Sequence, residues 1–316
     1  IINQAFVETG TGLFTKSGTG TLVLPVANTF DRKFNVTGTG ILRIAADSSL
    51  GVAPSTPVAD AITLQQGGKI QGGSTVGNDL TINSNRGVTL AGGDGGFHAW
   101  TGFTINYAGA ITGPGNLSKT DGGVLNFSGT SNHTGTTFGT DSGTFNFNGA
   151  TITSTSVLRG LNGTMNVNSG TTITTGKLLT ADADGAKGTF NLNGGTINVT
   201  GTDNTDTNTA SLLLGHWGAN GASSVFNISG GTLNAAGAEM KFGWDSAIMS
   251  LTQTGGVVNV LGLDFAARNN NAAYNLAGGE LNLGASGMQG NAPSSSMWVA
   301  RHLVHLPIGP PTKQLL

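Results

Sequence analysis

Residues 190–198 read Phe-Asn-Leu-Asn-Gly-Gly-Thr-Ile-Asn, and the chain repeats this phrase. Close copies stand at 145–152, 165–173, 226–234 and 274–282, with a looser one at 251–259. The first residues of successive copies lie 20, 25, 36, 25 and 23 positions apart. Repeats of this length are typical of stacked architectures, in which each unit buries its apolar side only against its neighbours.

The composition favours a thin core that runs along an axis. Of 316 residues, 53 are Gly, none is Cys, 37% are apolar and 9% are charged, and the net charge is −2. Disorder usually combines low hydrophobicity with high net charge, which this chain lacks. The absence of Cys excludes disulfides and thiolate metal sites. The chain opens Ile1-Ile2 without Met or a basic start, so we expect a piece of a longer protein.

Charge and hydropathy exclude two further classes. The 14 Lys and Arg are scattered, whereas nucleic-acid binding needs several cations on one face. No apolar run approaches the ~18 residues that a membrane-spanning helix needs.

Apolar and polar residues alternate over short spans that end at Gly or Asn, which indicates strands. In residues 225–243, Phe226 and Ile228 are expected to point inward on a first strand, before Gly230-Gly231 turns the chain. Leu233 then points inward on a second strand, and Met240 and Phe242 do so on a third. We predict an all-β fold, a single-stranded parallel β-helix (β-solenoid) with about three short strands per coil. Equivalent side chains would stack ~4.8 Å apart.

An Asn follows the first apolar residue in most copies, at Asn146, Asn166, Asn191, Asn227 and Asn275. Identical amides one coil apart can form hydrogen-bonded ladders. These positions alternate with the inward apolar ones, so simple solvent-facing polar positions are an equal alternative.

A longer repeat occupies the first half. Residues 12–24, Gly-Leu-Phe-Thr-Lys-Ser-Gly-Thr-Gly-Thr-Leu-Val-Leu, match residues 115–127, Gly-Asn-Leu-Ser-Lys-Thr-Asp-Gly-Gly-Val-Leu-Asn-Phe, at an offset of 103 without a gap. The register continues to 42–44 and 145–147. This pattern resembles the autotransporter-associated β-strand repeat, in which Gly and Lys lead into a Gly-x-Gly-x-Leu-x-Leu strand. The later copies resemble the Gly-Gly-Thr repeats found beside it in large bacterial surface proteins.

The resemblance covers roughly residues 8–290. It implies a right-handed parallel β-helix and a secreted or surface-exposed bacterial passenger region, with no shared catalytic residues and no cofactor. We expect residues 1–142 to form coils of the first repeat type and 143–290 to continue the same β-helix with Gly-Gly-Thr coils. Residues 291–316 hold four of the eight Pro and are expected to be an irregular tail.

The acidic residues offer little for catalysis. Glu occurs only at positions 8, 239 and 280, whereas glycoside hydrolysis needs two carboxylates across a sugar. The paired residues Asp182 and Asp184, and Asp203 and Asp206, fall in loops between coils, where Asp is common in turns. Weak Ca²⁺ loops are the alternative for these four residues.

Two aromatic residues suggest a corner of the rod. Trp217 and Trp244 each follow the third strand of neighbouring coils, and His216 adjoins the first. They either cover the core or form a platform for sugar rings.

We therefore expect an extracellular stalk or adhesin-like passenger at the bacterial cell surface, without catalysis. Its partners would be host or environmental glycans or surface proteins, and unpaired end strands would allow end-to-end self-association. A carbohydrate-binding β-helix module is the alternative, and a polysaccharide lyase or hydrolase is less favoured. An ice-binding face is disfavoured further, because no strict Thr-x-Thr column is visible at one repeat position.

Overall fold

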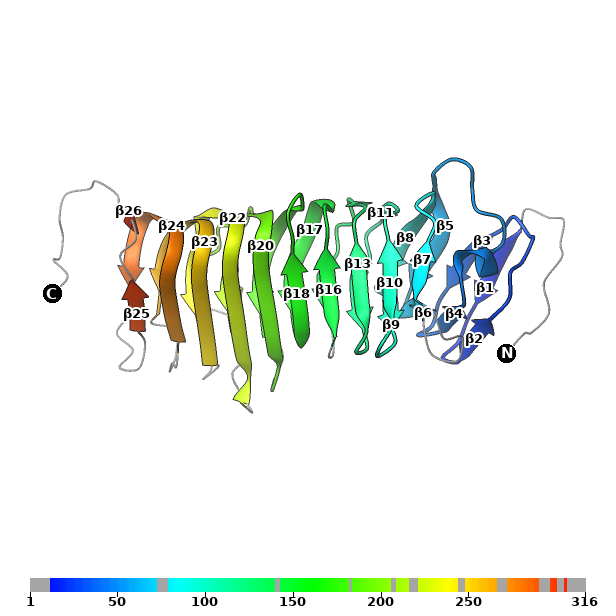
Figure 1. Cartoon of the computed structure of the whole chain (residues 1–316), viewed down its shortest axis with the longest axis horizontal. Helices are drawn as coiled ribbons and strands as arrows, with labels where there is room; N and C mark the ends of the chain where they lie inside the picture. The colour runs from blue at the N-terminus through cyan, green and yellow to red at the C-terminus, as the bar shows by residue number, and fades with distance from the viewer. Residues whose placement is uncertain are drawn as a thin grey trace.

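The computed structural model describes residues 12–72, 79–139, 143–181, 184–205, 209–215, 221–243, 248–265 and 272–289, together with the backbone of strands at 296–299 and 304–305. These residues form a long rod, with β1 and β2 at one end and β25 and β26 at the other (Figure 1). Paired strands run parallel, so the predicted all-β parallel β-solenoid is confirmed. The described residues contain no α-helix, and their one short 3-10 helix is η1 (Asp47–Leu50).

The strands stack in three columns, here called faces A, B and C. Face A begins with β1 (Leu13–Lys16), β3 (Lys33–Val36), β5 (Val58–Gln65), β8 (Arg86–Gly92), β11 (Ile111–Thr112) and β14 (Thr130–Ser131). Face B begins with β2 (Thr21–Leu24), β4 (Ile41–Ile44), β6 (Gly68–Gly72), β9 (Asp94–Ala99), β12 (Asn116–Thr120) and β15 (Thr137–Gly139). Face C begins only in the fourth coil, with β7 (Leu80–Ile82), β10 (Thr104–Tyr107), β13 (Val124–Phe127), β16 (Thr144–Phe147) and β18 (Gly163–Val167).

Later strands turn the corners without a break. Faces A and B share β17 (Thr151–Gly160) and β19 (Thr172–Thr180); faces C and A share β20 (Lys187–Val199), and β21 (Leu212–Leu214) lies on face B. Three strands pass over all three faces: β22 (Ser223–Phe242), β23 (Ile248–Asp264) and β24 (Ala272–Gln289). The backbone of β25 (Ser296–Val299) and β26 (Val304–His305) pairs with β24, so strands continue into a segment where the sequence shows no repeat.

The core runs along the axis and is built from the residues that the alternation predicted. Phe226, Leu233 and Met240 lie inward on faces C, A and B of one coil, and each is buried. Phe226 pairs in register with Phe190 of the coil before, and their ring centroids are 5.1 Å apart. One apolar cluster extends from Leu24 to Leu283. Burying each such side chain contributes roughly 1.5–3 kcal/mol.

The Gly-Gly pairs form the corner between faces C and A. Gly231, Gly256 and Gly279 occupy the second position of the pair in successive coils, with φ of 76°, 69° and 82°. A Cβ on Gly256 would lie 2.6 Å from the carbonyl oxygen of Gly231, and one on Gly279 would lie 2.4 Å from that of Gly256. The positive φ and the close stacking of backbone therefore both require Gly here.

The longest coil, 36 residues between Phe190 and Phe226, carries an excursion over the outside of face B. Ala210 of this excursion packs on Leu179 and Leu213, which point outward from β19 and β21, with Val157 beside them. Asn204 binds the next coil, because its Oδ1 accepts a hydrogen bond from the backbone N–H of Glu239 at 2.7 Å. A second, small apolar cluster therefore anchors the excursion to the rod.

Within the described part of the chain, no helix has the length and apolar character needed to cross a membrane.

Candidate interaction face

The outer side of face C carries a continuous ladder of amide side chains. Each member points outward between two buried residues of its strand and is half-buried against its neighbours. The Nδ2 of each member donates to the Oδ1 of the member one coil before, at 2.6–2.9 Å. The ladder consists of Asn106, Asn126, Asn146, Asn166, Asn191 and Asn227. The two readings left open by the sequence are therefore both right, since these amides face solvent and also bond to each other.

Two shorter ladders run parallel to the first. On face C, the Nδ2 of Asn168 donates to Asn148 at 2.6 Å and that of Asn193 donates to Asn168 at 2.9 Å. On face A, four amides are joined at 2.7–2.9 Å: Asn198, Asn234, Asn259 and Asn282. The ladder of Asn106 to Asn227 ends at β23, where Thr252 pairs in register with Asn227.

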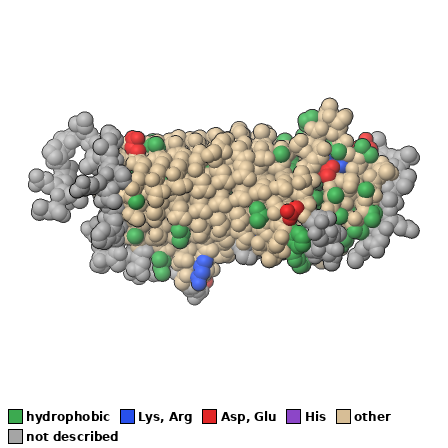
Figure 2. Space-filling model, viewed as in Figure 1, with side chains coloured by type: hydrophobic (Ala, Val, Ile, Leu, Met, Phe, Trp, Pro, Cys, Tyr) green, Lys and Arg blue, Asp and Glu red, His purple; other side chains and the backbone are tan. Residues whose placement is uncertain are grey.

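The ladder leaves each amide with fixed, unused hydrogen-bonding capacity. An Asn side chain has two N–H donors and an oxygen with two lone pairs. An inner member uses one donor and one lone pair along the ladder, so one of each remains for solvent or a ligand; Asn126 differs, because its Oδ1 also accepts from Asn148 at 3.5 Å. The view of face C is dominated by uncharged atoms over most of its length (Figure 2). Face C is therefore a polar surface without net charge, and its groups are held in place.

The predicted aromatic corner cannot be placed, since Trp217, Trp244 and His216 lie outside the described residues. The structure instead describes Trp100, directly after β9 of face B, with 38% of its surface exposed. Sequence reasoning missed this residue. The available signal was its place just after a strand, since Trp217 and Trp244 follow Leu214 and Phe242 by three and two residues in the sequence.

Trp100 covers a polar cluster on the outside of face B. Arg43, Gln71 and His98 lie in register on three successive coils. The Arg43 guanidinium carbon lies 5.2 Å from the centroid of the Trp100 ring, and the His98 ring lies 6.2 Å from it. The indole therefore spans Gln71, which is fully buried. Arg43 Nε donates to Gln71 Oε1 at 2.6 Å, and His98 Nε2 lies 3.1 Å from Asp121 Oδ2.

The candidate calcium loops are only partly described, because Asp182 and Asp206 fall outside the described residues. Asp184 is exposed in its turn. Asp203 Oδ1 accepts hydrogen bonds from the Thr205 hydroxyl at 2.6 Å and the Thr205 N–H at 3.0 Å. Hydrogen bonds from Thr205 and Thr209 lower the pKa of Asp203 to about 2. These hydrogen bonds are typical of an Asp side chain that stabilises its own turn. Among the described residues, no group of three His, Cys, Asp or Glu side chains is placed to hold a metal ion.

A buried ion cluster on face B was not predicted. Lys241 Nζ lies 2.8 Å from Asp264 Oδ2 and 3.2 Å from Glu239 Oε2. The lysine side chain is 1% exposed. Gln289 Nε2 donates to the other Glu239 oxygen at 3.2 Å. A catalytic base must reach a substrate, whereas these groups are enclosed and bond to each other, so the cluster joins neighbouring coils.

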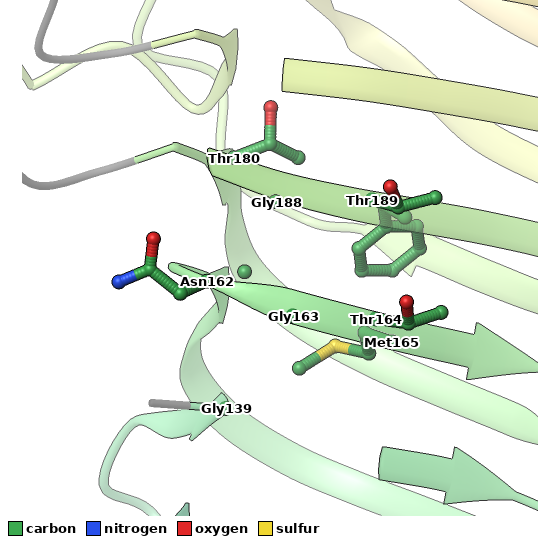
Figure 3. A pocket seen from close by; sticks show the side chains of 10 residues that line it. Gly139, Asn162, Gly163, Thr164, Met165, Thr180, Gly188 and Thr189 are labelled. Atoms are coloured by element: carbon green, nitrogen blue, oxygen red, sulfur yellow. The ribbon is translucent and has the colours of Figure 1, made fainter. Parts of the chain in front are cut away.

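The hollows of the described residues are small or open. One at the corner of faces B and C, beside Gly139, Met165 and Thr180 (Figure 3), has a volume of about 10 Å³, which is close to the space that a single water needs. A wide groove of about 500 Å³ lies beside residues 52–56, which link η1 to β5. Two cations at this groove are paired, since Lys33 contacts Asp60 at 2.7 Å and Arg86 contacts Asp47 at 2.8 Å.

The described residues thus offer face C as a polar surface with a continuous ladder of oriented amides. Comparison of the chain with known protein families, curated proteins and solved structures gives no match.

Proposed function

We propose that this chain is a stalk: an extracellular, adhesin-like passenger segment of a bacterial surface or secreted protein, without catalytic activity. The proposal is carried by the continuity of the rod. Face A and face B strands follow each other from β1 and β2 to β24, and one apolar cluster extends from Leu24 to Leu283. In a solenoid each coil adds length without changing the rest, at ~4.8 Å per coil.

The side chains support the same role. Three of the described acidic groups are tied into the structure: Glu239 and Asp264 bond to a buried Lys241, and Asp203 bonds to Thr205. The resemblance to autotransporter-associated repeats supports an extracellular or cell-surface location. On this proposal, exposed corners and excursions contact host or environmental glycans or surface proteins, and the coils set their distance from the cell.

The test is to lengthen the rod by whole coils. Val124 pairs in register with Thr144, and Thr144 with Thr164, so residues 124–143 and 144–163 each form one coil. A second copy of residues 124–163, inserted after residue 163, should lengthen the particle by about 10 Å in small-angle X-ray scattering. Thermal unfolding should remain cooperative. A Gly/Ser insert of equal length at the same place is the control, and should not extend the rigid rod.

Two outcomes would contradict the proposal. Loss of folding on coil duplication, with the Gly/Ser insert tolerated, would show that the coils are not interchangeable units of length. Release of unsaturated uronic acid from pectin or alginate in the presence of Ca²⁺ would show a lyase.

A further inference from the structure

Face C carries a second regular column beside its amide ladder. Two residues before each ladder Asn, every coil from β10 to β22 presents a β-branched side chain outward. Strand pairing places these residues in register: Thr104, Val124, Thr144, Thr164, Thr189 and Val225. From β16 to β22 the column is the residue immediately before each copy of the repeated phrase, and strand pairing extends it back to Val124 and Thr104.

The two columns form a regular lattice with two repeats, and a hollow of about 220 Å³ lies beside its first coils, lined in part by Asn106 and Asn126. Neighbouring coils are ~4.7–4.9 Å apart, and two residues along a strand span ~6.6–6.8 Å. The groups at the lattice points are held in place, since β-branched side chains are stiff at χ1 and the Asn amides are bonded along the ladder. Methyl groups and hydroxyls therefore alternate across the face with oriented amides.

The chemistry of this lattice selects among ligands. Both columns lie on six four-residue strand segments, each of which begins at the β-branched residue and ends one residue after the ladder Asn. These segments contain no Lys, Arg, Asp or Glu: 104–107, 124–127, 144–147, 164–167, 189–192 and 225–228. A charged polymer would therefore form no ion pair with these segments. The outward positions of these segments carry no aromatic ring, so a sugar polymer would lack the flat apolar platform that it commonly stacks on. The favoured ligand is therefore uncharged, donates and accepts hydrogen bonds at every lattice point, and has a structure that repeats in two dimensions.

We propose that face C binds ice. Water in ice donates and accepts hydrogen bonds at every lattice point, and the prism face of hexagonal ice repeats at spacings close to the two of face C. The amides and hydroxyls hold the first layer of water in these positions, while the methyl groups of Thr and Val fit between water molecules. β-Branched residues are also common on strands for packing reasons alone, so the test must separate ligand binding from stability.

The experiment uses the full chain and a substitution at the centre of the face. Uptake into a slowly growing ice surface and thermal hysteresis are measured for the natural chain, for Thr164→Tyr, and for Thr56→Tyr as a control. Thr56 is exposed between η1 and β5, outside the strand segments that carry the two columns. We expect the natural chain and Thr56→Tyr to enter the ice and depress its growth temperature equally. Thr164→Tyr should lose most of both effects, because a protruding ring breaks the contact with ice.

Circular dichroism establishes that each variant is folded. If Thr164→Tyr does not fold, Thr164→Ser replaces it; this variant keeps the hydroxyl, removes one methyl group, and should show reduced hysteresis. Exclusion of the folded natural chain from ice would overturn the proposal, as would equal ice uptake by a folded face variant. Retention on cellulose or chitin without ice uptake would also overturn it, in favour of a neutral polysaccharide.

Discussion

The two copies of the long repeat, residues 12–44 and 115–147, have the same local structure but lie on different faces. The first copy places β1 and β3 on face A and β2 and β4 on face B. The second places β12 and β15 on face B and β13 and β16 on face C. The first coils have no face C strand before β7. The repeat therefore encodes a strand, a corner and a second strand, and the strands already present determine which face it occupies.

The conserved element between the copies is a lysine that closes the corner. Lys16 Nζ donates to the carbonyl oxygens of Ser17 at 2.6 Å and Gly18 at 3.1 Å. Lys119, at the equivalent position 103 residues later, donates to the carbonyl oxygen of Asp121. In both copies an ammonium group at the end of the first strand binds backbone carbonyls of the following turn. This contact explains why the motif contains Lys before its Gly residues.

The copies differ where their surroundings differ. At the two outward positions the first copy has Val23 and Arg43, and the second has Asn126 and Asn146, which belong to the ladder. At the corner, the buried Phe30 of the first copy is replaced by the buried His133. The inward apolar positions of the paired strands are buried in the second copy, and in the first copy all are buried except Phe14 and Leu22, which are half-buried. Local structure thus comes from the repeat, and stabilising side-chain contacts come from the neighbouring coils.

The largest effects are expected from equivalent core positions. Leu42 and Phe145 differ by the repeat offset and are both buried, on faces B and C. Leu42→Ala should lower the free energy of unfolding by about 2–5 kcal/mol and Phe145→Ala by about 3–5 kcal/mol, through lost burial and the cavity left behind. Urea unfolding followed by circular dichroism measures both.

Val52→Ala is the matched control, because Val52 is 57% exposed and such a change is usually within about 0.5 kcal/mol. If Leu42→Ala matched this control, the first copy would not share a cooperative core with the second, and their structural equivalence would be superficial.

The sequence predicts the parts of this structure that depend on local alternation. Phe226, Leu233 and Met240 are inward because strand residues alternate, and the Gly-Gly corners follow from the turn that they allow. Contacts between coils were predicted only where they fall within the repeated phrase. The Asn ladder was one of two alternatives, because its Asn stands at one position of that phrase, whereas the Lys241–Asp264 pair lies outside the phrase and was missed. Trp100 was missed because its cation partner, Arg43, lies two coils before it.

A smaller effect on the free energy of unfolding, dependent on pH, should distinguish the corner that holds His133 from the corner that holds Phe30. The His133 ring lies 2.6 Å from the Ser131 hydroxyl through Nδ1 and 2.9 Å from the Thr137 hydroxyl through Nε2. Burial lowers the pKa of His133 to about 4 from the ordinary 6.5, and a hydrogen bond at the Thr136 backbone offsets this only in part. The unfolded chain therefore takes up a proton below pH 6.5 that the folded chain resists.

The contribution of His133 to stability is complete above pH 6.5 and declines as the pH falls toward 4, by up to about 3 kcal/mol. His133→Phe installs the residue of the first copy. It should be less stable at pH 7, by about 1–3 kcal/mol, because two buried hydroxyls lose their partner, but its stability should vary less between pH 6.5 and 4.5. Urea unfolding across this range measures the slope. An unchanged slope would show that His133 does not titrate differently on folding.

The smallest effect concerns the ladder, which the second copy joins and the first does not. Asn146 donates to Asn126 at 2.8 Å and accepts from Asn166 at 2.6 Å. Asn146→Ala removes both bonds, and at roughly 0.5–1.5 kcal/mol each should lower the free energy of unfolding by about 1–3 kcal/mol. Asn275 has the same place in its repeat but is exposed, and the residue beside it on β23 is Thr252. Asn275→Ala should change the free energy of unfolding by no more than about 0.5 kcal/mol. Equal losses at the two positions would mean that Asn is retained for its strand or solvent properties alone, and that the amide ladder adds nothing to the stability of the rod.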